Sequence, residues 1–241
     1  MTIAPELEAI QQANEDVILP PSDLLSDEPP LETELHLRQI ILLLKCLEWL
    51  WRDRSDFYAA GNLSIYYSPK KIKNRDFRGP DFFVVLDTER KLRKSWTVWQ
   101  EDGKYPHVIV EILSDSTAET DRGEKKKLYQ DIFRTPDYFW FDPYTLEFTG
   151  FHLVDGKYQP LQANPQGQLW SQQLGLYLGI HQGLLRFFTA DGELVPTPEE
   201  TAIQEAQQKE IERQQKEIAQ QKLEKLAAKL RELDIEPDEL E

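Results

Sequence analysis

One acidic residue inside an apolar run constrains this chain more than any other feature. Glu111 interrupts the sequence VIVEIL, residues 108–113, in which every other residue is apolar. A run of this kind predicts a buried strand. An unpaired carboxylate buried there would cost several kcal/mol or shift its pKa. The rest of the chain must therefore supply a partner for Glu111.

A second carboxylate opens another short apolar run. Asp81 precedes FFVVL, residues 82–86, and a charged connection over residues 87–106 leads from there to the strand of Glu111. If the two runs pair antiparallel so that the paired residue numbers sum to 192, Asp81 lies opposite Glu111. Directly opposed residues have Cβ atoms about 5 Å apart. Two carboxylates at that distance repel each other unless a proton or a cation lies between them, which points to a divalent metal.

A helix with three consecutive lysines is predicted next, from about Glu119 to Phe133. Its buried stripe is expected to comprise four residues: Leu128, Tyr129, Ile132 and Phe133. Counting back by three and four positions puts Lys125 on that stripe, Lys126 at its edge and Lys127 on the outer face. A lysine near the two acids could act on a phosphoryl oxygen, or it could form a structural ion pair with Glu111. The spacing alone leaves both alternatives open.

The charge is distributed over three segments. Residues 1–32 carry eight acids and no base, and they are predicted to form a poorly ordered arm. Residues 33–190 carry twenty acids and twenty-one bases, and they are expected to form the folded domain. Residues 198–235 are predicted to form a polar helix, which is either a short coiled coil or an extended solvated helix.

Within the folded domain, apolar residues at helical spacing predict a first helix from near Leu31 to about Arg52, with Thr33 as its N-cap. A strand is expected over residues 62–67. The strand of Glu111 is followed, after the lysine helix, by strands over residues 137–142 and 146–153. The order of the elements over residues 157–188 is left open.

Several classes of protein are excluded by composition. The single cysteine excludes a disulfide framework and a cysteine zinc site. Four scattered histidines give no zinc-binding pattern. The first residues lack the pattern of a signal peptide, and no apolar stretch is long enough to cross a membrane. We therefore expect a soluble, cytoplasmic protein.

Three sequence motifs resemble those of the Uma-type putative restriction endonuclease family, a bacterial branch of the PD-(D/E)XK nuclease superfamily. The motifs are RGPDFFVVL, PHVIVEILSDSTAETDRGEKKKLY and RTPDYFWFDP, and the resemblance covers about residues 33–155. It implies a restriction-endonuclease-like α/β core with a helix, a mixed central sheet and a crossing helix. It also implies metal-dependent hydrolysis of phosphodiester bonds.

The resemblance further implies site residues. Asp81 corresponds to the acid of the PD motif, and Glu111 corresponds to the second acid. Many superfamily members place a lysine two residues after that acid, where this chain has Leu113. The Uma-type pattern instead resembles one with a lysine four residues before a tyrosine, which here is Lys125 before Tyr129.

The leading hypothesis is therefore a putative Mg²⁺-dependent endodeoxyribonuclease, with Mn²⁺ as an alternative ion. Asp81, Glu111 and the Ile112 carbonyl would bind the metal, and Lys125 would act on the water and the phosphate. Lys126 is the second choice for the lysine, and Gln39 and His36 are secondary candidates. Basic residues are expected to hold the DNA backbone: Lys70, Lys71, Lys73, Arg75 and Arg78, with a second basic loop at residues 90–94.

The alternative hypothesis is a catalytically silent nuclease-fold module. Such a module would bind a protein partner or form a homo-oligomer through residues 198–235, and its acidic tail would repel DNA or mask the basic loops.

Overall fold

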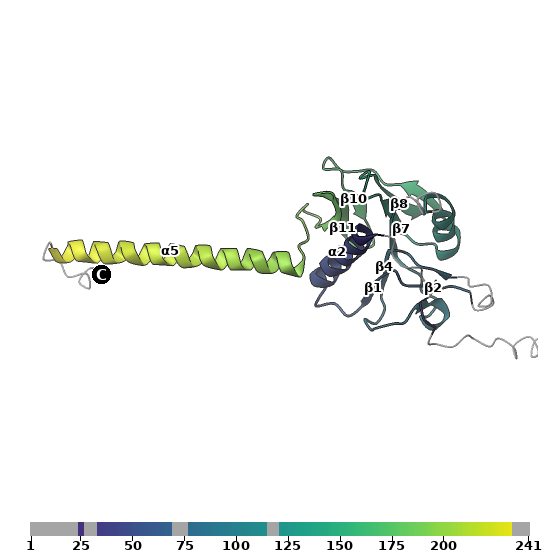
Figure 1. Cartoon of the computed structure of the whole chain (residues 1–241), viewed down its shortest axis with the longest axis horizontal. Helices are drawn as coiled ribbons and strands as arrows, with labels where there is room; N and C mark the ends of the chain where they lie inside the picture. Colours follow the sequence, from purple (N-terminus) through teal and green to yellow (C-terminus); the bar gives the residue numbers. More distant parts are fainter. Residues whose placement is uncertain (1–23, 27–32, 69–76, 115–120, 233–241) are drawn as a thin grey trace, which may run out of the picture. The chain divides into compact units, whose positions relative to one another are not determined.

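The computed structural model describes residues 24–26, 33–68, 77–114 and 121–232, and the chain forms two compact units (Figure 1). The first unit spans Met1–Val195 and the second spans Pro196–Glu241. The second unit contains one long helix, α5 (Pro198–Glu232). A capping box begins this helix, because Glu200 N donates to Thr197 Oγ1 at 3.1 Å and Thr197 N donates to Glu200 Oε2 at 2.7 Å.

The first unit is built on a mixed six-stranded sheet in the order β1-β4-β6-β7-β8-β9. The bounds of its strands are as follows: β1 Phe57–Gly61, β4 Phe82–Leu86, β6 Val108–Ile112, β7 Asp137–Phe141, β8 Phe148–Val154 and β9 Lys157–Pro160. Strands β6 and β7 are parallel, and all other neighbours in the sheet are antiparallel. The predicted α/β class with a mixed central sheet is therefore confirmed.

The pairing of β4 with β6 has the register predicted from the sequence. Phe82 lies opposite Val110, Phe83 opposite Ile109 and Val84 opposite Val108. One step further along the same register, Asp81 meets Glu111. The charged connection between the two strands therefore does not disturb the pairing.

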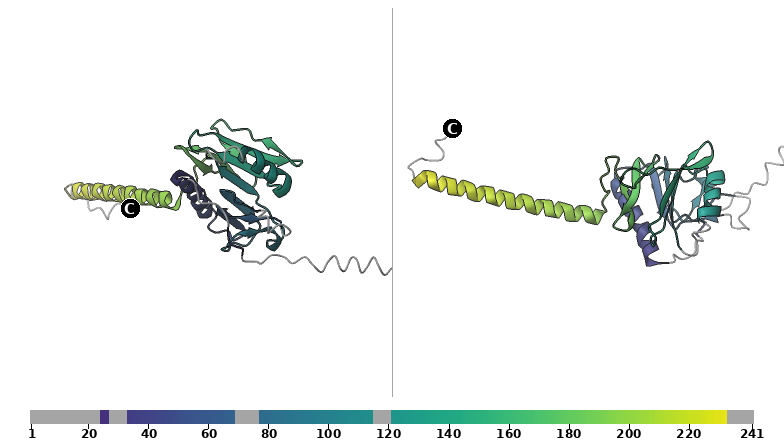
Figure 2. Two further views of the ribbon diagram at one scale, coloured as in Figure 1. Left: turned by 45° about the vertical axis from the view of Figure 1, so that its right-hand side comes forward. Right: turned by 90° about the horizontal axis from the view of Figure 1, so that it is seen from above.

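Two helices lie on opposite sides of this sheet (Figure 2, right). The helix α2 (Glu34–Leu50) begins at the predicted N-cap, since His36 N donates to Thr33 Oγ1 at 3.2 Å. The other helix joins the parallel strands β6 and β7, a connection that needs a crossover. This crossing helix comprises η3 (Asp121–Lys125), α4 (Lys126–Leu128) and η4 (Tyr129–Phe133).

The core has one layer on each face of the sheet. On one face, α2 packs on the even-numbered residues of β4 and β6, together with a three-stranded sheet. That sheet comprises β10 (Leu169–Ser171), β11 (Leu176–His181) and β12 (Leu184–Phe188). On the other face, the crossing helix packs on the odd-numbered residues of the same strands. Glu111 is odd-numbered and therefore faces the crossing helix.

Three predictions of local structure were wrong. The stretch 62–67 is not one strand, because the chain forms β1 before it and only the short strand β2 (Ile65–Tyr66) within it. The small residues Ala59, Ala60 and Gly61 gave β1 no strand signal. The connection 87–106 is not all loop, since it contains β5 (Trp96–Thr97) and η2 (Val98–Gln100). β2 pairs with β5 and with β3 (Phe77–Arg78) in a third sheet.

The third wrong prediction concerns the crossing helix. Tyr129 and Phe133 are buried as expected, but Ile132 is exposed. The last five residues form a π-type turn, η4, which has more residues per turn than an α-helix. The wider turn rotates Ile132 off the buried stripe that a regular α-helical count assigns to it.

Candidate active site

Glu111 is completely buried, and four elements of the fold surround its carboxylate. Its Oε1 accepts a hydrogen bond from the Tyr129 hydroxyl at 2.7 Å. Its Oε2 lies 3.2 Å from Lys125 Nζ and 3.3 Å from the backbone nitrogen of Asp81. The buried Glu111 carboxylate therefore has three partners: a lysine, a tyrosine hydroxyl and a backbone amide.

Asp81 is held where β4 begins. Its Oδ2 accepts a hydrogen bond from Ile112 N at 2.7 Å. Its Oδ1 lies 2.9 Å from Nε2 of His36, the side chain that α2 presents from its first turn. The Asp81 residue is 8% exposed, whereas Glu111 is fully buried, so solvent reaches this pair from the side of Asp81.

The structure separates the three consecutive lysines. Lys125 makes the ion pair with Glu111. Lys126 Nζ lies 3.4 Å from the centre of the Phe151 ring and 5.4 Å from that of Trp140, which are cation–π contacts. Burial lowers the pKa of Lys126. Lys127 is exposed. Of the three, Lys125 is the one that contacts the paired acids.

The two secondary candidates have different surroundings. His36 belongs to the site through its contact with Asp81. Gln39 is used elsewhere, because its Nε2 donates to Leu185 O at 2.9 Å and its Oε1 accepts from Leu185 N at 3.0 Å. Its amide thereby ties α2 to β12.

The expected contacts with the DNA backbone are only partly visible. Lys70, Lys71, Lys73 and Arg75 lie outside the described residues. Arg78 is half-buried, and its Nη1 donates to Phe77 O. In the second basic loop, Arg93 forms a two-pronged ion pair with Glu101, with bonds of 2.6 and 2.9 Å. Because its side chain is only 4% exposed, Arg93 holds the loop together and is not offered to a ligand.

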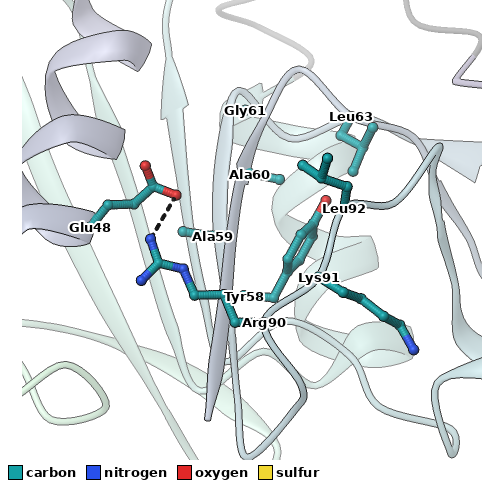
Figure 3. Close-up of a pocket in the computed structure, with 9 residues that line it drawn as sticks. All are labelled: Glu48, Tyr58, Ala59, Ala60, Gly61, Leu63, Arg90, Lys91 and Leu92. Atoms are coloured by element: carbon teal, nitrogen blue, oxygen red, sulfur yellow. Dashed lines mark ion pairs between the residues drawn. The ribbon is translucent and has the colours of Figure 1, made fainter. Parts of the chain in front are cut away.

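A cavity of about 610 Å³ lies beside the edge strand β1, and neither Asp81 nor Glu111 lines it (Figure 3). It is lined by nine residues: Glu48, Tyr58, Ala59, Ala60, Gly61, Leu63, Arg90, Lys91 and Leu92. Arg90 Nη2 and Glu48 Oε1 are 3.5 Å apart across it. No buried acid lies beside a basic group in the lining of this cavity. The polar contacts around Glu111 therefore identify the candidate active site better than the size of the cavity does.

The donor set at Asp81 and Glu111 fits a hard divalent cation. Within the described ranges, no group of three or more His, Cys, Asp and Glu side chains could hold a metal. Mg²⁺ needs only one or two carboxylates, because it retains several water ligands. The carboxylate oxygens are oriented by donors from the protein, namely Ile112 N, Tyr129 and Lys125, as is usual around metal ligands.

Sequence reasoning missed the role of the Tyr129 hydroxyl. Tyr129 was expected on the buried stripe as an apolar residue, and its ring is indeed fully buried. The available signal was its position four residues after Lys125, on the same face of the helix. A tyrosine placed there can bring its hydroxyl to the same acid as the lysine.

Comparison with known proteins finds similar solved structures and one family. A crystal structure described as a putative nuclease belonging to DUF820, from Anabaena variabilis, is similar over 61% of this chain and 76% of its own. The sequence identity is 12% and the TM-score is 0.43. No curated protein matches the chain significantly. None of the described helices has the length and apolar character needed to cross a membrane.

The family is shown by a match over most of the chain. The model of the Uma2 family, described as "Putative restriction endonuclease", matches residues 6–187. The match includes α2, the whole central sheet and the crossing helix, and therefore every residue of the candidate active site. It also begins inside the acidic arm, earlier than the resemblance at residues 33–155. The chain belongs to the Uma2 family of putative restriction endonucleases.

Proposed function

We propose that this protein hydrolyses phosphodiester bonds of DNA in a reaction that depends on Mg²⁺ or Mn²⁺. The observation that carries the proposal is the meeting of Asp81, Glu111 and Lys125. Asp81 N lies 3.3 Å from Glu111 Oε2, and Lys125 Nζ lies 3.2 Å from the same oxygen. Two acids and a lysine in one place form a recognised arrangement for metal-assisted phosphoryl transfer.

Asp81, Glu111 and the carbonyl of Ile112 would hold the ion. A bound Mg²⁺ would supply Lewis-acid stabilisation of the phosphoryl oxygens and lower the pKa of a water molecule. Lys125 would donate to a non-bridging oxygen of the phosphate, where negative charge develops. Tyr129 and His36 would keep the two carboxylates in place, since each contacts one of their oxygens.

In the reaction, a water molecule gives up a proton to the solvent as its oxygen forms a new bond to phosphorus, and the bond from phosphorus to a sugar oxygen breaks. The leaving oxygen takes a proton from water. Direct attack by water does not need a covalent intermediate on the protein. Positioning and electrostatic stabilisation would supply the catalysis.

The test is cleavage of supercoiled plasmid with Mg²⁺ or Mn²⁺. We expect the wild-type protein to cut, and Glu111→Gln and Asp81→Asn to lose cleavage while retaining the wild-type circular dichroism spectrum. Glu193→Gln, at an exposed position outside the proposed site, is the matched control and should cut normally. Equal cleavage by wild type and Glu111→Gln would reveal a contaminating nuclease and refute the proposal.

A second function, assembly through α5, is supported by a separate observation. Five large apolar side chains of this helix are between 49% and 67% exposed: Ile203, Ile211, Ile218, Leu223 and Leu226. Exposed apolar residues on a polar helix favour pairing with another helix. Sedimentation velocity of the full chain should show an oligomer that Ile211→Lys with Ile218→Lys converts to a monomer. A wild-type protein that sediments as a monomer would exclude self-assembly.

A further inference from the structure

The turn between β7 and β8 lies at the same edge of the sheet as the candidate active site. Strands β6 and β7 are parallel, and Ile112 is paired with Phe141. Their carboxyl ends therefore meet at one edge, where Ile112 N also donates to Asp81. We call residues 142–147 the hairpin tip. It begins directly after β7, the strand that borders the site.

The hairpin tip has a fixed conformation. Asp142 Oδ1 accepts hydrogen bonds from Tyr144 N at 2.9 Å and from Thr145 N at 3.1 Å. Leu146 N donates to the Asp142 carbonyl at 2.8 Å, and Asp142 N donates to Glu147 O at 2.9 Å. An aspartate that binds the amides two and three residues later is a strong turn-forming device. The side chains of Tyr144 and Leu146 are thus presented from a rigid backbone.

Two helices that flank the site also hold the hairpin tip. The Tyr144 hydroxyl lies 3.4 Å from Oγ1 of Thr33, the residue that caps α2. Thr33 precedes His36, the neighbour of Asp81, by three residues. On the other side, Glu147 forms an ion pair with Arg122 of the crossing helix. The hairpin tip therefore lies between the starts of the two helices that supply His36 and Lys125.

This rigid segment exposes large apolar side chains. Tyr144 is 60% exposed and Leu146 is 44% exposed. Leu146 also has a φ of 60°, in the left-handed region, which costs a non-glycine residue about 1–2 kcal/mol. Leu37, one turn after Thr33 on α2, is 43% exposed as well. An ordered, strained turn with exposed apolar residues beside a catalytic site indicates a contact with the ligand of that site.

The charges around the hairpin tip indicate which part of a nucleic acid it would contact. Arg122 is paired with Glu147, and Arg38 on α2 is paired with Glu34 at 2.6 Å. Both nearby arginines are therefore neutralised by acids, so this surface is poorly suited to a phosphate. An aromatic ring and a leucine suit the face of a base or a sugar, which every nucleotide offers.

We propose that Tyr144 stacks on a base of the nucleic acid next to the cleaved phosphodiester, with Leu146 packed against the same nucleotide. The proposal rests on the nuclease function proposed above. It adds a contact that is independent of base identity and of phosphate charge. A base can stack in this way where the strand is single or locally unpaired, so the contact favours unpaired substrate over intact duplex.

The test is binding of fluorescent single-stranded and duplex oligonucleotides with Ca²⁺ in place of Mg²⁺, measured by anisotropy over a range of salt concentrations. Tyr144→Ala should weaken binding to the single strand by about 5- to 150-fold, the range for losing one stacked base. Tyr144→Phe should bind as wild type does. The slope of log Kd against log salt should not change, because no phosphate contact is lost. Ile180→Ala, at an exposed position of β11, is the matched control.

Four results would overturn the proposal. Unchanged single-strand binding by Tyr144→Ala would refute the stacking contact, and the nuclease function would stand if Glu111→Gln still abolished cleavage. A salt slope reduced by about one would identify a phosphate contact instead. A Tyr144→Ala protein that binds DNA normally but sediments differently would assign the hairpin tip to a protein partner. A wild-type protein that neither binds nor cleaves nucleic acid would refute both proposals together.

Discussion

The hydroxyl of Tyr129 donates a hydrogen bond of 2.7 Å to Oε1 of the fully buried Glu111. Lys125, one turn earlier in the crossing helix, reaches the other oxygen of the same carboxylate. The helix thus supplies both a phenol and an ammonium group to one acid of the neighbouring strand. These two contacts fix the Glu111 carboxylate in one orientation.

Removing the Tyr129 hydroxyl should therefore destabilise the fold. Tyr129→Phe keeps the buried ring but leaves one oxygen of a buried carboxylate without its donor. We expect a loss of about 1–3 kcal/mol in the free energy of unfolding, measured by urea denaturation. Tyr144→Phe removes an exposed hydroxyl and should lose less than about 0.5 kcal/mol. Equal losses in the two variants would contradict the role given to the buried bond.

The two lysines should differ in their effect on catalysis. Lys125→Met should lower the cleavage rate about 100- to 1000-fold, because it removes the cation next to the developing charge. Lys126→Met should change the rate by less than about 5-fold, since its ammonium lies on the Phe151 ring. Single-turnover cleavage by both variants checks this. A larger loss for Lys126→Met would reassign the catalytic lysine.

His36 should act on the metal through Asp81. Its Nε2 lies 2.9 Å from Asp81 Oδ1, so it orients a proposed ligand without being one. His36→Ala should weaken Mn²⁺ binding about 10- to 100-fold by calorimetry, the usual effect of losing a residue behind a ligand. His36→Gln, whose amide can donate, should recover part of the affinity. Mn²⁺ affinity that is the same in all three proteins would exclude this role.

A second buried carboxylate should matter for stability and not for catalysis. Asp137 is fully buried where β7 begins, and it accepts from Ser171 Oγ at 2.6 Å and Gln173 N at 3.0 Å. His152 Nδ1 lies 2.7 Å from its other oxygen. Asp137→Asn should lower the free energy of unfolding by about 2–4 kcal/mol. Asp53→Asn, at an exposed position, is the control. The cleavage rate of the folded Asp137→Asn protein should stay within about 5-fold of the wild-type rate.

Acid should weaken the fold in part through His107. Burial lowers the pKa of His107, an effect that Asp87 opposes and Lys104 reinforces. Its Nδ1 also accepts a hydrogen bond from Leu86 N at 3.1 Å, which protonation would break. Because the folded pKa is below the unfolded value of 6.5, this contribution is complete above pH 6.5 and is lost as the pH falls through the folded pKa. His107→Asn keeps an acceptor and should show a smaller loss of stability between pH 7.5 and pH 5.

The sequence was sufficient for the part of the site that depends on local periodicity. The search for a partner of Glu111 led to the register that brings Asp81 to it, and helical spacing predicted that Lys125 faces the sheet. The sequence was insufficient for contacts that depend on tertiary packing. The amide of Gln39 pairs with Leu185, a residue 146 positions away, and nothing near Gln39 signals this. The edge strand β1 was missed because alanine and glycine form strands only through their neighbours.

The antiparallel register of β4 and β6 has a consequence for how such a chain can change over evolution. A slip of one residue would bring Phe82 or Pro80 to the place of Asp81, and the side chains that pack against α2 would change places with those that pack against the crossing helix. Selection for a well-packed interior therefore also preserves the position of Asp81 beside Glu111. The pairing of β4 with β6, and not the length of the connection over residues 87–106, keeps the two acids together.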